Sequence, residues 1–374
     1  MNRINVLQFI CPVGFYGAER WIIALVNNSD NQTVCHHLAV TDEAENQDLQ
    51  ITEQFPKGAG KVHRIKMKNR FDYSVIKHLM DIIENNNIHI IHTHGYKSDI
   101  LGLIVAKKAK IKCVSTPHGF GQPTDIKLKM FVKFGAWSLK YFDCIAPLSA
   151  QLYNEVLKVG IRKSKITYIQ NGVDLKELDP YLTQKRNRSP VDKKIIGFIG
   201  QMIPRKNIKD LLDIFDNLQN DIPNVELQLL GDGESRHELE KYSYQLKSSS
   251  KIKFLGFRQD RLDYLKNFDL FAMTSKDEGI PRCLMEAMAL EVPVAAYNIQ
   301  GVDQLLEHGK TGLLCEFGNK QYMKECWVSL LTDDELSGKL AKNARVFIDD
   351  NFSARRMSNE YLKLFKSIIK RSVH

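Results

Sequence analysis

The stretch from Thr274 to Gly312, TSKDEGIPRCLMEAMALEVPVAAYNIQGVDQLLEHGKTG, decides how the rest of this sequence is interpreted. It follows an apolar run, Leu270 to Met273, that is typical of a buried strand, and Pro281 suits the first turn of a helix. Glu278 therefore lies in a loop, and Glu286 lies on the helix that follows. A helix N-terminus suits a phosphate, and carboxylates accept hydrogen bonds from hydroxyls. The stretch predicts a site for a sugar joined to a nucleotide diphosphate; helix capping alone is the alternative explanation for its acidic residues.

Length and composition set the class of protein. A chain of 374 residues, 43% hydrophobic and 26% charged, predicts two globular domains. It has no apolar run of roughly 18 residues and no signal-peptide layout, so we expect a cytoplasmic protein. Its seven scattered cysteines form no CxxC pair, which favours neither zinc nor a disulfide framework. The net charge of +9 implies an acidic partner, but no nucleic-acid-binding module is present, so we expect no nucleic acid.

Strand and helix patterns alternate along the chain, and this alternation predicts an α/β fold with parallel sheets. Ser74 is a plausible helix cap, and the polar segment 181–194 is expected to link two domains. We expect strands at 4–10, 37–41, 62–66, 88–93, 112–115, 144–147, 165–169, 195–199, 225–230 and 252–255, and helices at 18–27, 74–86, from 207, and over 320–370 with a break near 351–353.

Histidines follow two of the expected strands. His92 and His94 have the same-face spacing of a strand, but no third ligand is evident, so a metal site is not expected. One of the two is expected to pack in the core, and the other to face the ligand cleft with Lys97. His118 follows the strand at 112–115, at the end where α/β sheets bind ligands. A loop histidine that bonds only to backbone is the alternative for His118.

The segment 125–143, DIKLKMFVKFGAWSLKYFD, interleaves lysines with large apolar residues. A basic amphipathic helix of this kind lies on an anionic membrane with its cations among the headgroups. The alternative is an ordinary surface helix whose lysine stems cover the domain core. Peripheral contact with a membrane is therefore a hypothesis.

The opening loop, residues 11–17, contains no G-x-G-x-x-G, which disfavours a nicotinamide oxidoreductase. Instead, the ordered set EG at 278–279, EAMA at 286–289, PVAA at 293–296, Gly301 and GKTG at 309–312 resembles the donor-binding segment of the retaining glycosyltransferases of family four. That family has the GT-B fold, in which two Rossmann-like domains with parallel sheets face each other across a cleft. The resemblance implies an acceptor-side domain at 1–180, a linker at 181–194, a nucleotide-sugar domain at 195–352 and a helix at 353–374 that crosses back to the first domain.

The resemblance also implies the reaction and its residues. We expect a retaining, metal-independent hexosyltransferase that uses a nucleotide diphosphate sugar, with UDP favoured, and no cofactor. Its acceptor would be a glycan or lipid-linked glycan in cell-surface polysaccharide or lipopolysaccharide biosynthesis. The implied catalytic residues are His118 and Glu278; the donor-binding residues are Gly17, Arg205, Lys206, Phe257, Arg258, Gly279, Ile280, Leu284 and Glu286; the acceptor-side residues are Tyr16, His94 and Lys97.

Three positions depart from the family pattern. Tyr16 replaces the first glycine of the usual Gly-Gly-Ala-Glu loop, and Pro281 replaces a glycine whose N–H would face a phosphate. Gln201 stands where the family has the first of two cations, so Arg205 would have to supply it. Two other functions remain open: a nucleotide-sugar epimerase of the same architecture, and a non-catalytic protein that binds anionic glycans or nucleic acid.

Overall fold

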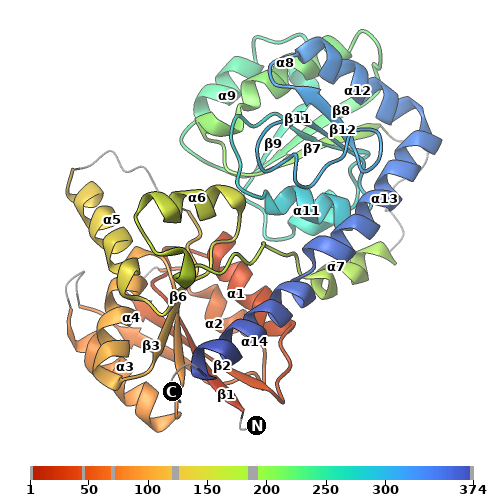
Figure 1. Cartoon of the computed structure of the whole chain (residues 1–374). Coiled ribbons are helices and arrows are strands. Elements are labelled where there is room, and N and C mark those ends of the chain that lie inside the picture. The colour runs from red at the N-terminus through yellow and green to blue at the C-terminus, as the bar shows by residue number, and fades with distance from the viewer. Residues whose placement is uncertain (1–2, 44–46, 69–71, 120–125, 184–192, 371–374) are drawn as a thin grey trace. The chain divides into compact units, whose positions relative to one another are not determined.

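The chain divides into two compact units (Figure 1). Unit 1 comprises Met1–Asp174 and Ala354–His374, and unit 2 comprises Leu175–Ser353. The structure, a computed structural model, describes residues 3–43, 47–68, 72–119, 126–183 and 193–370.

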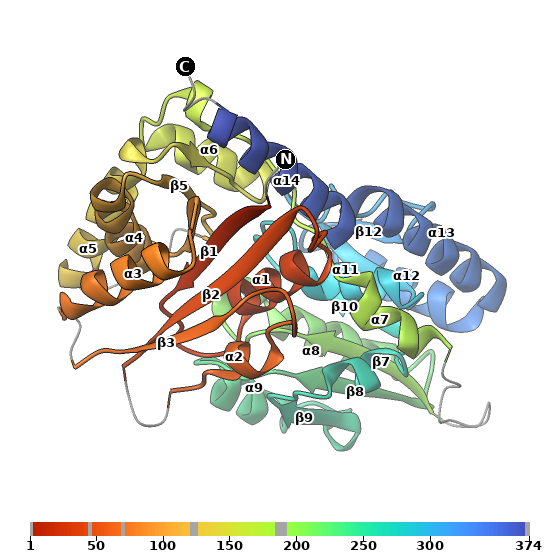
Figure 2. The same cartoon turned by 90° about the horizontal axis from the view of Figure 1, so that it is seen from below.

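Unit 1 is built on a six-stranded sheet in the order β3-β2-β1-β4-β5-β6, with every pair parallel. Strands β1, β2 and β3 run side by side in Figure 2. Successive side chains of β1 point to opposite faces, so Val6 joins one buried cluster and Leu7 joins the other. Because both faces are covered, nearly all residues of β1, β2 and β4 are buried, whereas the edge strand β3 is largely exposed. The strands are β1 Ile4–Ile10, β2 Val34–Asp42, β3 Val62–Lys66, β4 Ile90–His94, β5 Lys112–Ser115 and β6 Cys144–Ile145.

The last helix of the chain, α14 (Ala354–Lys370), belongs to unit 1 and packs against α1. Its Tyr361 and Phe365 are buried in the same cluster as Trp21 of α1. The helices of unit 1 before it are α1 Gly17–Asn27, α2 Gln50–Gln54, α3 Ser74–Asn85, α4 Tyr96–Ala109, α5 Ile126–Ser138 and α6 Ala150–Lys158.

Unit 2 repeats the arrangement with a second parallel sheet, ordered β12-β11-β10-β7-β8-β9. Counted from its own first strand, each sheet has the order 3-2-1-4-5-6 of the doubly wound dinucleotide-binding fold. The strands are β7 Lys194–Ile199, β8 Val225–Leu230, β9 Ile252–Gly256, β10 Leu270–Met273, β11 Val294–Asn298 and β12 Leu313–Glu316, and the helices are α7 Leu175–Leu182, α8 Ile208–Leu218, α9 Arg236–Ser243, α10 Arg261–Leu265, α11 Arg282–Ala289, α12 Lys320–Thr332 and α13 Asp334–Phe352.

The expected fold class, two Rossmann-like α/β domains, is confirmed, but three local expectations are wrong. Residues 165–169 form no strand: β6 is only two residues long, and a single bridge joins Ile145 to Ile166. Ser74 is the first helical residue and not the cap, and its N–H donates to Asp72 Oδ1 at 3.0 Å. The helical series after 320 has an additional break at Asp333, whose side chain caps α13.

The division between the units differs from the expected boundary at residue 180. Helix α7 packs against α10 and α11, so the chain enters unit 2 at Leu175. The segment expected as a linker, 181–194, therefore lies within unit 2, and its residues 184–192 are outside the described part of the chain. The expected C-terminal helix, 353–374, corresponds to α14, which begins at Ala354; residues 371–374 are likewise outside the description.

A close backbone approach fixes the loop that carries Glu278. Gly301 has a φ of 90°, and a Cβ added to it would lie 1.9 Å from the carbonyl oxygen of Gly279. A side chain at this position would therefore be strained by its backbone conformation and would also push the Glu278 loop away.

We predict that Gly301→Ala lowers the free energy of unfolding by about 2–4 kcal/mol, because it combines an unfavourable φ with a steric clash. Gly338→Ala is the matched control: Gly338 lies inside α13, and a Cβ there meets nothing within 4 Å. That change should stabilise by about 0.5–1 kcal/mol. Urea unfolding of the three proteins checks both values, and equal effects of the two substitutions would contradict the role given to Gly301.

Candidate functional site

The first group of candidate residues lies where neighbouring strands β7 and β10 end. Parallel strands place their carboxyl ends at one edge of a sheet, so the loops after β7 and β10 lie together. The first loop contains a single helical turn, Pro204–Lys206, and then Asn207 in the left-handed conformation. The Thr274 hydroxyl, directly after β10, donates to the Asn207 carbonyl at 3.0 Å and ties the two loops together.

This edge brings together three of the predicted donor-site residues. The Glu278 carboxylate is buried, and the Lys206 ammonium forms an ion pair with its Oε1. Arg205 Nη1 lies 3.0 Å from Oε2 of the same carboxylate. Burial alone would raise the pKa of Glu278, but the charges of Lys206 and Arg205 outweigh it and lower that pKa below its usual value. Gln201 is exposed, and Arg205 stands beside Lys206 as the second cation.

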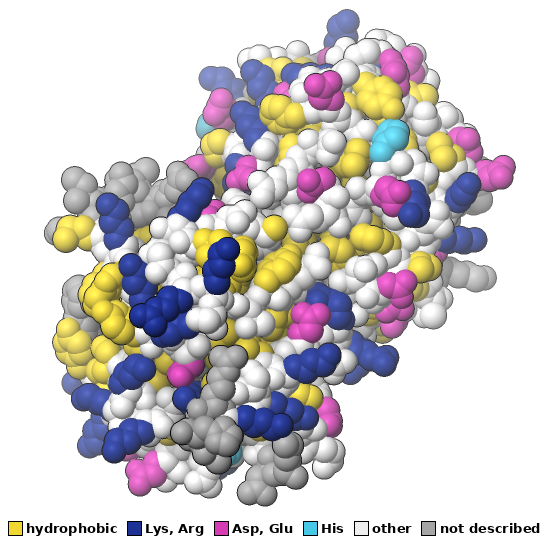
Figure 3. Space-filling view, viewed as in Figure 1, with side chains coloured by type: hydrophobic (Ala, Val, Ile, Leu, Met, Phe, Trp, Pro, Cys, Tyr) yellow, Lys and Arg dark blue, Asp and Glu magenta, His cyan; other side chains and the backbone are white. Residues whose placement is uncertain are grey.

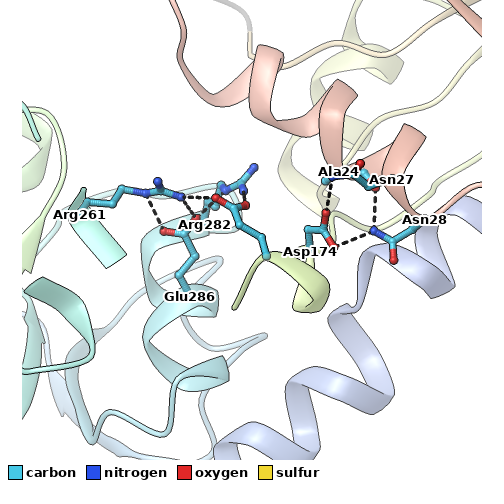
Figure 4. Close-up of polar contacts among 8 residues, drawn as sticks. Ala24, Asn27, Asn28, Asp174, Arg261, Arg282 and Glu286 are labelled. Atoms are coloured by element: carbon cyan, nitrogen blue, oxygen red, sulfur yellow. Dashed lines mark hydrogen bonds and ion pairs between the residues drawn. The ribbon is translucent and has the colours of Figure 1, made fainter. Parts of the chain in front are cut away.

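The second predicted carboxylate, Glu286 on α11, is buried between two arginines (Figure 4). Arg261 Nη2 lies 2.7 Å and Arg282 Nε 2.8 Å from Glu286 Oε1, while Arg261 Nε lies 3.3 Å from Oε2. Burial opposes ionisation, yet Arg261 and then Arg282 hold the pKa of Glu286 at about 2. Neither arginine was predicted from the sequence. Arg282 had a local signal, since it precedes Glu286 by four residues on a helix, but Arg261 had none.

The other donor-site candidates occupy varied positions in unit 2. Phe257 is 56% exposed after β9, and Arg258 pairs with Asp260 at 2.7 Å. Gly279 lies against Gly301, and Ile280 is half-buried. Leu284 is fully buried, so its side chain packs in the interior of unit 2.

In unit 1, the predicted histidines His94 and His118 belong to a chain of hydrogen bonds. His118 Nε2 lies 3.2 Å from His94 Nδ1, and His94 Nε2 lies 2.8 Å from Gln8 Oε1. The Gln8 amide nitrogen lies 3.0 Å from His36 Nδ1, and His36 Nε2 lies 2.9 Å from the Ser29 hydroxyl. The chain thus runs from the loop after β5 through β4 and β1 to β2 and the end of α1.

Both histidines of β4 are buried, which corrects the expectation that one of them would face a cleft. His92 and His94 share one face of the strand, with ring centroids 4.4 Å apart, and both rings contact Trp21. His92 Nε2 lies 2.7 Å from the Thr116 hydroxyl, which in turn lies 2.8 Å from the Tyr361 hydroxyl of α14. This burial could not be predicted from the sequence, because α14, whose Tyr361 packs against His92, belongs to the C-terminal segment of the chain.

Burial keeps these imidazoles neutral. It lowers the pKa of His36 and of His118 to about 3, and it lowers the pKa values of His92 and His94 well below their usual range. With neutral rings, one assignment of protons satisfies the chain: the Gln8 amide donates to His36 Nδ1, His94 Nε2–H donates to Gln8, and His118 Nε2–H donates to His94 Nδ1. This assignment leaves His118 Nδ1 as a hydrogen-bond acceptor.

The acceptor-side candidates Tyr16 and Lys97, near the starts of α1 and α4, each bind a glutamate of unit 1. The Tyr16 N–H donates to Glu19 Oε2 at 3.0 Å, while the Tyr16 ring is 50% exposed, and Gly17 is the first residue of α1. Lys97 Nζ lies 2.6 Å from Glu43 Oε2 in an ion pair.

Two features are absent from the part of the chain that the structure describes. Among the described residues, no group of three or more His, Cys, Asp or Glu side chains could hold a metal ion. Within the same described ranges, no helix is long and apolar enough to cross a membrane.

Two family models match the two parts of the chain. The model described as Glycosyltransferase Family 4 matches residues 15–177, and the model described as Glycosyl transferases group 1 matches residues 182–347. The chain is 28% identical over 312 residues to the Escherichia coli UDP-Gal:alpha-D-GlcNAc-diphosphoundecaprenol alpha-1,3-galactosyltransferase, with 78% of each chain covered. It is 24% identical over 328 residues to the Staphylococcus aureus capsular polysaccharide biosynthesis glycosyltransferase CapM, covering 83% of this chain and 86% of that relative.

Solved structures share the fold. Anabaena HepE in complex with UDP superposes with a TM-score of 0.79 at 19% identity, covering 97% of this chain and 100% of that chain. A glycosyltransferase from Rickettsia africae superposes with a TM-score of 0.78 at 21% identity, covering 99% of this chain and 100% of that chain.

We predict that the neutral histidine chain makes stability fall in mild acid. A histidine whose pKa is lower in the folded than in the unfolded chain has no effect on stability above about pH 6.5. Below that value the unfolded chain binds the proton more readily, so the free energy of unfolding falls as the pH falls. His36→Gln should therefore reduce the dependence of the unfolding free energy on pH, between pH 6.5 and 4.5, by up to about 1.4 kcal/mol per pH unit. Exposed His78, on α3, provides the control His78→Gln, which should keep the wild-type slope. Identical slopes in wild type and His36→Gln would contradict the prediction.

Proposed function

This chain belongs to the glycosyltransferases of family four and group one, and we propose that it transfers a hexose from a UDP-sugar to a lipid-linked glycan with retention of configuration. The observation that carries the proposal is that Arg205 and Lys206 both pair with the same buried carboxylate, that of Glu278. Two cations facing one carboxylate leave an excess positive charge, which suits an anionic diphosphate.

The same pairing suggests how the reaction is helped. In a transfer through an oxocarbenium-like transition state, negative charge grows on the leaving diphosphate. Lys206 and Arg205 would stabilise that charge, in a position fixed before the substrate arrives, without a metal ion. Glu278 would then be available to accept hydrogen bonds from hydroxyls of the donor sugar, and Glu286 from the ribose.

His118 has a separate part in the proposal. Its ring is neutral, and the hydrogen-bond assignment leaves Nδ1 as an acceptor. We infer that His118 accepts a hydrogen bond from a donor-sugar hydroxyl and orients the sugar for transfer. His94 then acts behind His118 by holding its ring, and not as a contact to the acceptor.

The choice of UDP and of the acceptor is supported by relatives. Anabaena HepE has been crystallised with UDP and with UDP-glucose. The Escherichia coli relative uses UDP-Gal and a diphosphoundecaprenol-linked sugar by its name, and a Campylobacter jejuni relative, 25% identical over 315 residues, is also named for a diphospho-undecaprenol substrate. These names favour a UDP-sugar and a lipid-linked acceptor for this chain.

A surface of α5 supports contact with the membrane that would hold such an acceptor. Figure 3 shows hydrophobic side chains gathered over α5 with Lys and Arg beside them. Met130, Phe134, Trp137 and Tyr141 follow one another at helical spacing, and each is between 46% and 68% exposed. Aromatic residues of this kind favour the membrane interface, and exposed lysines at positions 133 and 140 suit anionic headgroups. The side chains of 126–129 and 131 are outside the description.

The two other functions predict different outcomes with purified protein. A nucleotide-sugar epimerase converts the donor without any acceptor, whereas a glycosyltransferase gives a new glycosidic product only when the acceptor is present. A non-catalytic binding protein shows no turnover under either condition. Product analysis with UDP-sugar alone, and then with a lipid-linked glycan, separates the three.

Lys206→Ala should weaken UDP binding by about 1.5–3 kcal/mol, or about 10- to 150-fold, because it removes a charge-assisted phosphate contact. The control is Lys209→Ala on nearby α8, where the ammonium lies over the Tyr242 ring, 4.7 Å from its centroid. Calorimetric titration with UDP, GDP and ADP measures both variants, and thermal melting confirms that they are folded. Equal affinity of wild type and Lys206→Ala for UDP would refute the placement of the diphosphate.

The double variant Phe134→Ser/Trp137→Ser should bind anionic vesicles at least about tenfold more weakly, because it removes two apolar side chains from the proposed membrane surface. Tyr244→Ser is the control, since Tyr244 of unit 2 is also an exposed aromatic residue. Sedimentation with phosphatidylglycerol-containing vesicles at low and high salt measures the binding. If the wild-type protein stays in solution at low salt, the membrane proposal fails.

A further inference from the structure

The two arginines that hold Glu286 also hold a second carboxylate, that of Glu177 on α7. Arg282 Nη2 lies 3.2 Å from Glu177 Oε2, and Arg261 Nη2 lies 3.5 Å from Glu177 Oε1. Two carboxylates and two guanidinium groups therefore alternate in a closed ring within unit 2, and their formal charges cancel. We call Glu177, Arg261, Arg282 and Glu286 the charge ring.

The members of the charge ring differ in burial. The Glu286 side chain is only 2% exposed, whereas the Glu177 side chain is 35% exposed. Arg282 uses Nε for Glu286 and Nη2 for Glu177, so different nitrogens of one guanidinium contact the two carboxylates. A guanidinium is planar and its N–H groups have fixed directions. Holding one edge of Arg282 on Glu177 therefore sets the direction of the N–H that reaches Glu286.

Glu177 itself is held in place by the rest of α7. Two residues further along the same helix, Asp179 lies 2.8 Å from Arg345 of α13. Arg345 also donates through Nη1 to the carbonyl oxygen of Ala289, the last residue of α11, at 2.9 Å. Helix α7 is therefore linked to both ends of α11. Glu177 pairs with Arg282, the first residue of α11, and Asp179 pairs with Arg345, which also binds Ala289, the last residue of α11.

Among the residues that the structure describes, the donors to Glu286 leave one of its acceptor positions unoccupied. A carboxylate has about four lone-pair sites. Oε1 of Glu286 accepts from both arginines, and Oε2 accepts from Arg261. The remaining site is on Oε2, and its direction depends on how the two arginines hold the carboxylate.

We propose that Glu177 is a positioning residue of the donor site, which acts through Arg261 and Arg282 to aim the free lone pair of Glu286 at a ribose hydroxyl of the nucleotide. The inference rests on the proposed function, because it takes Glu286 as the ribose contact. Glu177 is assigned no contact with the nucleotide itself.

The test compares Glu177→Gln with Asp221→Asn, its matched control. Asp221 is 42% exposed and pairs with Lys324 of α12 at 2.8 Å, outside the charge ring. Both changes remove one negative charge from an ion pair of unit 2, but only the first breaks the charge ring. For Glu177→Gln we expect about fivefold weaker UDP binding, or about 1 kcal/mol, and a similar rise in KM for the UDP-sugar, with kcat unchanged. Asp221→Asn should keep wild-type values. An unchanged Kd in Glu177→Gln overturns the proposal, and so does tighter binding, which would show the arginines acting as free cations for the diphosphate.

A double-mutant cycle distinguishes positioning from a general structural role. If Glu177 acts only through Glu286, then Glu177→Gln should cause no further loss of UDP affinity in the Glu286→Gln background. Additive losses overturn the proposal. If the wild-type protein binds no UDP, the proposed function fails and this inference fails with it. If the wild type binds UDP and the cycle is additive, only the inference fails.

Discussion

A carboxylate that is buried away from water keeps its charge only where cations or hydrogen-bond donors compensate it, and unit 2 supplies cations for two such carboxylates within one stretch of chain. Glu278 and Glu286 are eight residues apart, on the loop and helix that follow β10. The sheet order places β7 beside β10, and this brings Lys206 and Arg205 to Glu278. The cations for Glu286 come from α10 and from α11 itself. The close approach of Gly301 to the Glu278 loop, and the packing of α7 on α10 and α11, depend on the same arrangement.

Unit 1 holds its histidine cluster without charge. The imidazoles of His36, His92, His94 and His118 are neutral, and hydroxyl, amide and imidazole groups from several elements bind most of their ring nitrogens. Because each neutral ring has one donor and one acceptor nitrogen, fixing the proton at one position fixes it along the chain. His118 is thereby presented as an acceptor. The Glu278 and Glu286 sites of unit 2 therefore offer charged groups, whereas the histidine cluster of unit 1 offers neutral hydrogen-bonding groups.

The parts of the fold and site that could be predicted from sequence are those with local signals. Largely apolar runs predicted ten of the twelve strands that the structure describes, all but β11 and β12, and Lys206 and Glu278 lie in loops that follow two of them. Arg282 was missed although it precedes Glu286 by four residues on the same helix. Arg261 and Glu177 were missed because they are brought to the Glu286 site by the packing of α7 and α10, which no spacing encodes. The burial of His94 was missed for a similar reason, since α14 helps to cover that cluster.

Unit 1 consists of two segments of chain that are separated by the whole of unit 2. Tyr361 and Ser358 of α14 complete hydrogen bonds with Thr116 and Ser29, and Phe365 fills the same core. A ribosome delivers the first segment long before α14 exists, whereas unit 2 has its full sequence as soon as Ser353 has emerged. Domains usually complete their folding in order from the N-terminus during synthesis. Here the second unit can finish first, and the growing chain must carry an incomplete first core until its last helix is made.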